Sequence, residues 1–377
     1  MKYRNLWVAI LCTMAVNAGM TSCVDDDEEP CTTCGTEDDA CGGTDADYKG
    51  QVLILNQGSW NSIDASLCRY NSTNGTITPN LFSTINEISL GDTGQDMIYY
   101  NDQVYLTATG SKTVYRIGRC GILKKAYHAD AEVRSLAAKD GKLYVSCYGG
   151  KVLKLNTETM EKEAELTVAE HANLEGMTIC DNMLYVAKSY SINEGNYIYH
   201  NTLEAINLNN FTHVAGYEVG VNPNDVLEEE DKVYVLSYGD YLTHGYSLGY
   251  ITPGTETTYT HICPASKMAS YNDIIYFAYS ATDWSDWEHP ATVTNFGSYN
   301  TKTGRLNETS FLKPSEATTK LASSAIYMLE INPDNGDFYI ATSDYVNHST
   351  VYRFDREGNY ITEFSTGGIN ACQAIFL

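Results

Sequence analysis

One phrase recurs along most of this chain: a turn containing Asn, Asp or Gly, followed by a tyrosine between two apolar residues. The copies are NDQVYL (101–106), DGKLYV (140–145), DNMLYV (181–186), EDKVYV (230–235), NDIIYF (272–277) and NGDFYI (335–340). Their tyrosines are 39, 41, 49, 42 and 63 residues apart. A period of about 40–50 residues with several strands in each unit is typical of a β-propeller.

Each repeat predicts one four-stranded antiparallel blade. A short strand precedes the turn, as in DMIYY (96–100), and two strands follow the triplet, as in TVYRI (113–117) and LKKAYH (123–128). Asn, Asp and Gly suit the turn because they tolerate the positive φ that tight hairpins need.

Six phrases give six blades, and the two ends of the chain supply a seventh. KGQVLILN (49–56), SLCRYN (66–71) and TITPNLF (76–82) read as the second, third and fourth strands of a blade without a first strand. CQAIFL (372–377) reads as a first strand with nothing after it. The sequence therefore predicts an all-β, seven-bladed β-propeller, closed by pairing of the C-terminal strand with the N-terminal blade.

The N-terminal residues predict export and a lipid anchor. Residues 1–22 combine a positively charged start, a short apolar run and small residues, which is typical of a signal peptide. Cys23 follows, which indicates lipidation at that cysteine; ordinary cleavage that leaves Cys23 free is the alternative. Residues 23–47 are acidic and are expected to be a disordered tether, and residues 48–377 form the propeller. No later segment resembles a transmembrane helix.

Charge and cysteine content restrict the possible ligands. The formal net charge of −24 argues against nucleic acid as a partner. The cysteines of the predicted domain show no tight spacing, so we expect no disulfide framework and mostly small buried residues. These are Cys68, Cys120, Cys147, Cys180, Cys263 and Cys372. In the tether, Cys31 and Cys34 form a CxxC followed by Cys41, which without a second ligand pair is weak evidence for zinc.

Aromatic residues collect in the connections between the second and third strands, all of which lie on one face of a propeller. The long interval before the last repeat contains an insertion at 280–296. Loops on a rigid scaffold often carry binding residues, and Tyr and Trp are good binding surfaces. The alternative is that the rings pack under their loops and hold them down. We predict a ligand site formed by Trp60, Tyr148, Tyr190, Tyr197, Tyr199, Tyr238, Tyr241, Tyr246, Trp284, Trp287, His289 and Tyr345.

Evidence for catalysis is weaker. Asp96, Glu175 and Asp225 stand where some propeller lactonases and lyases hold a divalent metal, but such residues can also bond strand ends around the channel. The sequence has no nucleophile elbow, no HExxH and no phosphate loop. We therefore expect a binding protein rather than an enzyme, with no catalytic residue, no metal site and no cofactor.

The stretches VLILNQGSWNSIDASLCRYNSTNGTI (52–77) and GDTGQDMIYYNDQVYLT (91–107) resemble YncE-like seven-bladed propellers. With the lipidated, acid-flanked N-terminus, the mature chain is similar to the BtuG-type surface lipoproteins of gut Bacteroides. The resemblance implies a lipid-anchored outer-membrane protein that faces the cell exterior. It also implies that the protein captures cobalamin or another corrinoid and delivers it to a TonB-dependent outer-membrane transporter of the BtuB type. A surface glycan-binding propeller and a metal-dependent lactonase or lyase are the alternatives.

Overall fold

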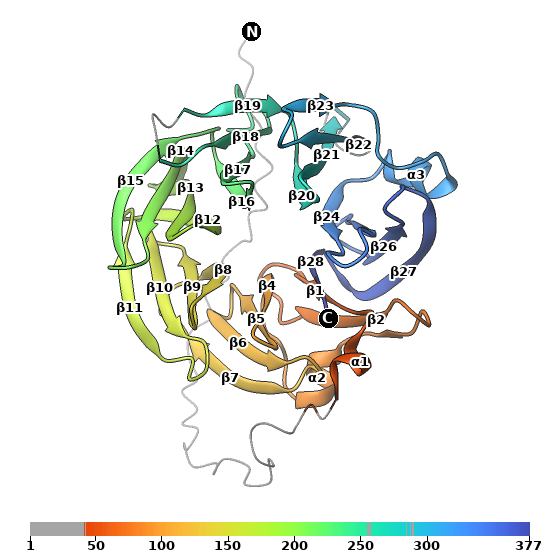
Figure 1. The fold of residues 1–377 in the computed structure, drawn as a ribbon, viewed down its shortest axis with the longest axis horizontal. Helices are drawn as coiled ribbons and strands as arrows, with labels where there is room; N and C mark the ends of the chain where they lie inside the picture. Colours follow the sequence, from red (N-terminus) through yellow and green to blue (C-terminus); the bar gives the residue numbers. More distant parts are fainter. Residues whose placement is uncertain (1–40, 42, 255–257, 284, 287, 289) are drawn as a thin grey trace. The chain divides into compact units, whose positions relative to one another are not determined.

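Seven four-stranded antiparallel sheets stand around a central axis in the computed structural model of this protein (Figure 1). The structure describes residues 41, 43–254, 258–283, 285–286, 288 and 290–377. The predicted all-β, seven-bladed propeller is confirmed. None of the helices in the described part of the chain is both long and apolar enough to cross a membrane.

Each blade is described from its innermost strand outward. Blade 1 comprises β28 (Ala371–Phe376), β1 (Gln51–Asn56), β2 (Ser66–Asn71) and β3 (Ile77–Thr78). Blades 2 and 3 comprise β4 (Gly94–Tyr100), β5 (Gln103–Ala108), β6 (Thr113–Gly118) and β7 (Leu123–His128), then β8 (Val133–Lys139), β9 (Lys142–Cys147), β10 (Lys151–Asn156) and β11 (Lys162–Thr167). Blade 4 comprises β12 (Ala172–Cys180), β13 (Met183–Asn193), β14 (Asn196–Asn207) and β15 (Thr212–Glu218).

The remaining blades follow the same order. Blade 5 comprises β16 (Pro223–Glu229), β17 (Lys232–Ser237), β18 (Ser247–Ile251) and β19 (Thr260–Cys263). Blade 6 comprises β20 (Lys267–Tyr271), β21 (Ile274–Asp283), β22 (Ala291–Asn300) and β23 (Arg305–Asn307). Blade 7 comprises β24 (Ile326–Ile331), β25 (Phe338–Thr342), β26 (His348–Phe354) and β27 (Tyr360–Ile369).

The repeated phrase places a tyrosine on the second strand of each blade from 2 to 7. Tyr105, Tyr234 and Tyr339 are among the largest fully buried side chains of the described residues. In the preceding turns, Asp231 has φ of 57° and Asp273 has φ of 62°. These backbone angles explain the Asn, Asp and Gly of the repeat, because few other residues adopt positive φ at little cost.

The ring closes as the sequence predicts. β28 pairs antiparallel with β1, and Leu53 lies opposite Ile375 while Ile54 lies opposite Ala374. The two ends of the described propeller thus share one sheet, and β28 covers the edge of β1 that would otherwise stay open.

The outer strand of blade 1 is shorter than expected from TITPNLF. On its outer side β2 pairs only with the two residues of β3, and the chain then turns into helix α2 (Leu81–Asn86). Pro79 has no N–H to continue the ladder, and Asn80 adopts a left-handed φ of 51°. Leu81 and Phe82 are buried against the core, so the apolar residues that suggested a strand pack through a helix instead.

The expectation of no disulfide in the domain is wrong for one cysteine. Cys120, between β6 and β7, is bonded to Cys41 across a sequence separation of 79 residues. The segment expected to be a disordered tether ends in helix α1 (Asp45–Tyr48), where Asp45 pairs with Arg119 at 2.6 Å. Of the other domain cysteines, Cys68, Cys147, Cys180 and Cys263 are free and buried, and Cys372 is free and partly buried.

Several expectations concern residues outside the described ranges. They are the signal peptide, the lipidated Cys23, the CxxC of Cys31 and Cys34, and the loop residues Trp284, Trp287 and His289.

Candidate ligand-binding site

One face of the propeller, called here the loop face, carries the connections between second and third strands and those between successive blades. Most large apolar side chains that are exposed among the described residues lie in these connections or in the hairpin ends of blades 4 and 6. They are Trp60, Ile63, Ile88, Ile192, Tyr197, Ile198, Tyr241, Leu242, Val293, Tyr345 and Val346. The exposed apolar residues elsewhere are Ile85, which borders the turn between β6 and β7, and Tyr99, Val214, Tyr360 and Ile361. A concentration of this kind on one face is typical of a binding surface.

Five of the predicted tyrosines form a continuous chain of ring contacts from blade 3 to blade 5. The ring centres of Tyr148 and Tyr190 are 6.0 Å apart, and those of Tyr190 and Tyr197 are 5.4 Å apart. Tyr197 then contacts Tyr199 at 6.1 Å, and Tyr199 contacts Tyr241 at 5.8 Å. Separations between 4.5 and 7 Å are those of favourable aromatic pairs. We call this chain the tyrosine wall.

A second group of rings continues from blade 5 into blade 6. The ring centres of Tyr238 and Tyr246 are 5.2 Å apart, and Tyr246 lies 6.2 Å from Tyr279. Burial raises the pKa of the Tyr241 hydroxyl, and the nearby hydroxyls of Tyr246 and Tyr238 act in the same direction. The two groups of rings are therefore close neighbours, joined at blade 5.

Two predicted residues lie apart from the tyrosine wall. Tyr345 contacts Tyr327 of β24, with ring centres 5.8 Å apart, and it is 64% exposed. Trp60 is 57% exposed and makes no ring contact with another described aromatic residue. Trp284, Trp287 and His289 stay predictions, since they fall outside the described ranges.

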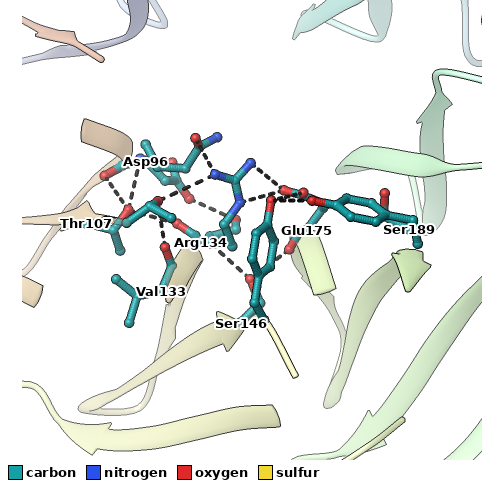
Figure 2. Close-up of polar contacts among 12 residues, drawn as sticks. Asp96, Thr107, Val133, Arg134, Ser146, Glu175 and Ser189 are labelled. Atoms are coloured by element: carbon teal, nitrogen blue, oxygen red, sulfur yellow. Dashed lines mark hydrogen bonds and ion pairs between the residues drawn. The ribbon is translucent and has the colours of Figure 1, made fainter. Parts of the chain in front are cut away.

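Figure 2 shows an ion pair between Arg134 of blade 3 and Glu175 of blade 4, which Tyr148 of the tyrosine wall contacts. The Nε and Nη2 atoms of Arg134 lie 2.8 and 2.7 Å from the same oxygen of Glu175, and both side chains are largely buried. The hydroxyl of Tyr148 donates to the other oxygen of Glu175 at 2.8 Å. Burial opposes the charge of Arg134, but the carboxylate of Glu175 offsets this and the pKa of Arg134 is raised.

The pair continues into a hydrogen-bonded arc around the axis. Arg134 donates from Nη1 to Gln95 Oε1 at 2.7 Å, and Gln57 donates from Nε2 to the same oxygen at 3.0 Å. The hydroxyl of Tyr327 donates to Gln57 Oε1. The ammonium of Lys267 lies 5.3 Å from the centre of the Tyr327 ring. The polar floor of the loop face, defined as Gln57, Gln95, Arg134, Glu175 and Tyr327, thus spans blades 7, 1, 2, 3 and 4.

The carboxylates considered as metal ligands have other partners. Glu175 belongs to the ion pair, and Asp96 accepts from the Ser135 hydroxyl at 2.8 Å and from the Leu136 N–H at 2.7 Å. Both carboxylates therefore bond to residues of the inner strands around the channel, which was the alternative to metal binding. No group of three or more His, Cys, Asp and Glu side chains within the described ranges is arranged to hold a metal ion.

A further group of charged side chains, which includes Glu330, Asp225, Asp96 and Lys267, lies around the central channel. Burial, together with the carboxylates of Asp225 and Asp96, raises the pKa of Glu330 to about 8, while Lys267 acts to lower it. Burial also raises the pKa of Asp225, against the effect of Lys267. The sequence indicates Asp96 and Asp225 as candidates for this place, whereas no sequence pattern indicates Glu330.

The sequence did not indicate Gln57, Gln95 or Tyr327 as site residues. One signal was available: Gln95, Arg134, Glu175 and Tyr327 hold the same position on the inner strands of four blades. Each lies two residues before the inner-strand residue that pairs next to the repeat tyrosine, as Met97 pairs with Leu106 and Leu329 with Ile340. Alignment of the blades on the repeat would therefore have grouped them.

A cavity of about 540 Å³ lies at the seam between blades 7 and 1, away from the tyrosine wall. Its lining includes Ile63, Asp64, Asn80, Glu87 and His348. The short β3 and the turn into α2 leave this space beside β2. None of the predicted ligand-binding residues lines it.

Comparisons with known proteins bear on the fold. No protein-family profile matches the sequence, and no curated protein matches it. A hydrazine synthase structure from Kuenenia stuttgartiensis is similar with a TM-score of 0.54 and 14% identity, over 70% of this chain and 77% of that chain. The WD40 repeats of RRP9 are similar with a TM-score of 0.51 and 8% identity, over 72% and 80%. At such identities, this chain shares with these proteins the propeller fold and nothing finer.

Proposed function

We propose that this protein is a cell-surface lipoprotein that captures cobalamin or a related corrinoid and delivers it to a TonB-dependent outer-membrane transporter. The observation that carries the proposal is the tyrosine wall beside a polar floor on the loop face. The resemblance of the sequence to BtuG-type lipoproteins supplies the class of ligand, and the arrangement of the site is compatible with it.

The chemistry of a corrin suits such a surface. A corrin is broad and partly apolar, and its edge carries amide side chains that form hydrogen bonds. Aromatic rings offer flat apolar area with a hydroxyl at the edge and lose little conformational entropy on binding. The amides and hydroxyls of the polar floor can satisfy a fringe of amides. The net charge of −24 favours a ligand without strong negative charge.

Two features support an exported location. The signal-like residues 1–22 precede Cys23, and the bond between Cys41 and Cys120 belongs to the class of structural disulfides that form mainly outside the cytosol. Transfer to a transporter requires a docking surface, and the exposed apolar side chains of the loop face are of the type found in protein interfaces.

Titration calorimetry of the purified protein with cyanocobalamin tests the proposal. We expect saturable binding of one corrinoid per propeller, and a red colour that remains with the protein through gel filtration. A panel of polysaccharides is the control set. If cyanocobalamin produces no heat and no co-elution at protein concentrations of about 0.1 mM, a Kd in the micromolar range is excluded and the proposal fails.

A glycan-binding surface protein is the second candidate. The exposure of Trp60, Tyr241 and Tyr345 favours it, because each is more than half exposed and offers a flat face on which a sugar ring can stack. Binding of a polysaccharide from the same panel, with no binding of cyanocobalamin, would replace the first proposal by this one.

A further inference from the structure

The Arg134–Glu175 pair consists of one group that can only donate hydrogen bonds and one that can only accept them. A guanidinium has N–H donors and no acceptor, whereas an ionised carboxylate has acceptors and no donor. Each partner also bonds to a neutral side chain that can do both. The pair therefore sets the direction of every hydrogen bond that starts from it.

The first series of bonds runs from Glu175 through Tyr148 to Tyr190. Glu175 requires a donor, so the single proton of the Tyr148 hydroxyl points toward it over 2.8 Å. Tyr148 can then only accept from Tyr190, whose hydroxyl donates to it at 3.3 Å. Burial raises the pKa of Tyr190. The bond to Tyr148 uses the proton of the Tyr190 hydroxyl and leaves its oxygen lone pairs.

The second series runs from Arg134 through Gln95 and Gln57 to Tyr327. Arg134 requires an acceptor, so Gln95 turns its carbonyl oxygen toward the guanidinium, at 2.7 Å. That oxygen also faces Gln57, which must present its NH₂ group, at 3.0 Å. The carbonyl of Gln57 is then left for Tyr327, whose hydroxyl donates to it. No other assignment of the two amides satisfies all these contacts.

Both series end on tyrosines that support the exposed aromatic surface. Tyr190 packs on Tyr197, which is 58% exposed, with ring centres 5.4 Å apart. Tyr327 packs on Tyr345, with ring centres 5.8 Å apart. In both cases the hydroxyl proton points back into the protein, and only oxygen lone pairs are left for a ligand. Burial raises the pKa of Tyr327, so its hydroxyl keeps its proton at neutral pH.

We infer that the Arg134–Glu175 pair makes the hydroxyl oxygens of Tyr190 and Tyr327 acceptors toward the loop face, which selects ligands that donate hydrogen bonds to them. Tyr190 and Tyr327 are the specificity-determining residues, and Gln57, Gln95, Arg134 and Glu175 are positioning residues. Primary amides and hydroxyl groups can donate to these two oxygens, whereas a carboxylate, which can only accept, faces their lone pairs. This inference rests on the proposed function for the identity of the ligand, but the direction of the hydrogen bonds does not.

Neutron diffraction from crystals of the perdeuterated protein tests the direction without any ligand. We expect the deuteron of Tyr327 on the line to Gln57 Oε1, that of Tyr190 directed to Tyr148, and that of Tyr148 directed to Glu175. A deuteron of Tyr327 or Tyr190 that points toward the loop face overturns the inference, whatever the ligand of the protein is.

A comparison of two ligands tests selectivity. The probes are cyanocobalamin and its derivative in which peripheral side-chain amides are hydrolysed to carboxylates. We expect the wild-type protein to bind the amide form at least tenfold more tightly. In Gln57→Met the Tyr327 hydroxyl is free to turn and donate, so the preference for the amide form should fall at least threefold, although the net charge is unchanged.

Two further variants separate direction from structure. Tyr327→Phe removes the acceptor, and it should weaken binding of the amide form without improving binding of the carboxylate form. Tyr99→Phe is the control, because its hydroxyl bonds to Asp102 in a turn of the opposite face, and it should change neither affinity. An unchanged preference in Gln57→Met overturns the selectivity. If the wild-type protein binds neither probe, the proposed function fails, and the neutron result alone decides the direction of the bonds.

Discussion

Arg134 and Tyr148 share a single carboxylate: the guanidinium binds one oxygen of Glu175, and the phenol hydroxyl donates to the other. The guanidinium carbon also lies 5.0 Å from the centre of the Tyr148 ring. A buried charge with both an ionic and an aromatic partner is costly to disturb, because the remaining charge keeps its desolvation penalty. This relationship links the inner strands of the ring to the loop-face aromatics.

The first prediction concerns this pair. Arg134→Met should lower the free energy of unfolding by roughly 3–5 kcal/mol, because it leaves Glu175 buried without its counter-ion. Urea denaturation followed by circular dichroism measures the change. Arg356→Met is the matched control, since Arg356 and its partner Glu357 are both exposed and surface pairs contribute little. Equal midpoints for the two variants would contradict the importance of the buried pair.

The second prediction concerns the tyrosine wall. Tyr197→Ala combined with Tyr241→Ala should weaken cyanocobalamin binding at least tenfold, or about 1.4 kcal/mol, because two exposed rings of the site are removed. Calorimetry gives the affinity, and thermal unfolding checks that the fold is intact. Tyr360→Ala serves as the control, as Tyr360 is exposed on β27 outside the loop-face connections. The same loss of affinity in both proteins would place the ligand elsewhere.

The third prediction concerns the disulfide. Cys41→Ser should lower the free energy of unfolding by about 2–4 kcal/mol, because the bond closes a long loop in the unfolded chain. Chemical denaturation of the variant and of the reduced wild-type protein should give similar shifts. Peptide mapping without reduction provides the direct check, in which a peptide containing Cys41 is joined to one containing Cys120. Alkylation of both cysteines in the unreduced protein would rule out the bond.

The fourth prediction concerns pH. Because the folded-state pKa of Glu330 is raised to about 8, from its ordinary value of 4.5, the folded state holds a proton that the unfolded state releases. The contribution of Glu330 to stability is therefore complete below about pH 4.5 and is lost as pH rises toward 8. In Glu330→Gln this loss is absent. As pH rises from 5 to 8, the unfolding free energy of the variant should increase relative to that of the wild type. A difference between the two proteins that stays constant over this range would refute the assignment.

The blades can be predicted from the sequence because each copy of the repeat is formed by interactions within a short stretch of chain. The tyrosine of each copy and the turn before it lie within one hairpin, so period and turn type are visible without the fold. The short β3 is harder to foresee, because Leu81 and Phe82 are apolar in a strand and in a helix alike. Pro79 was the one local indication that the ladder would stop.

The candidate site is predictable only in part. Loop tyrosines can be assigned to one face from the strand order, and the chain from Tyr148 to Tyr241 agrees with that assignment. The polar floor depends on contacts between distant blades: Tyr327 and Gln57 are 270 residues apart. The bond between Cys41 and Cys120 likewise has no spacing signal, since it joins the predicted tether to a turn of blade 2.

The pairing of β28 with β1 also bears on how the chain reaches its folded state. Every other strand of the ring is synthesised before Ala371–Phe376, so a nascent chain that has completed blade 7 still carries β1 with an open backbone edge. Such an edge can pair with another molecule and so promote aggregation. Contacts between strands more than three hundred residues apart are also slow to form. A cell that makes this protein must therefore keep a chain with an open β1 away from its own copies until Ala371–Phe376 have been synthesised.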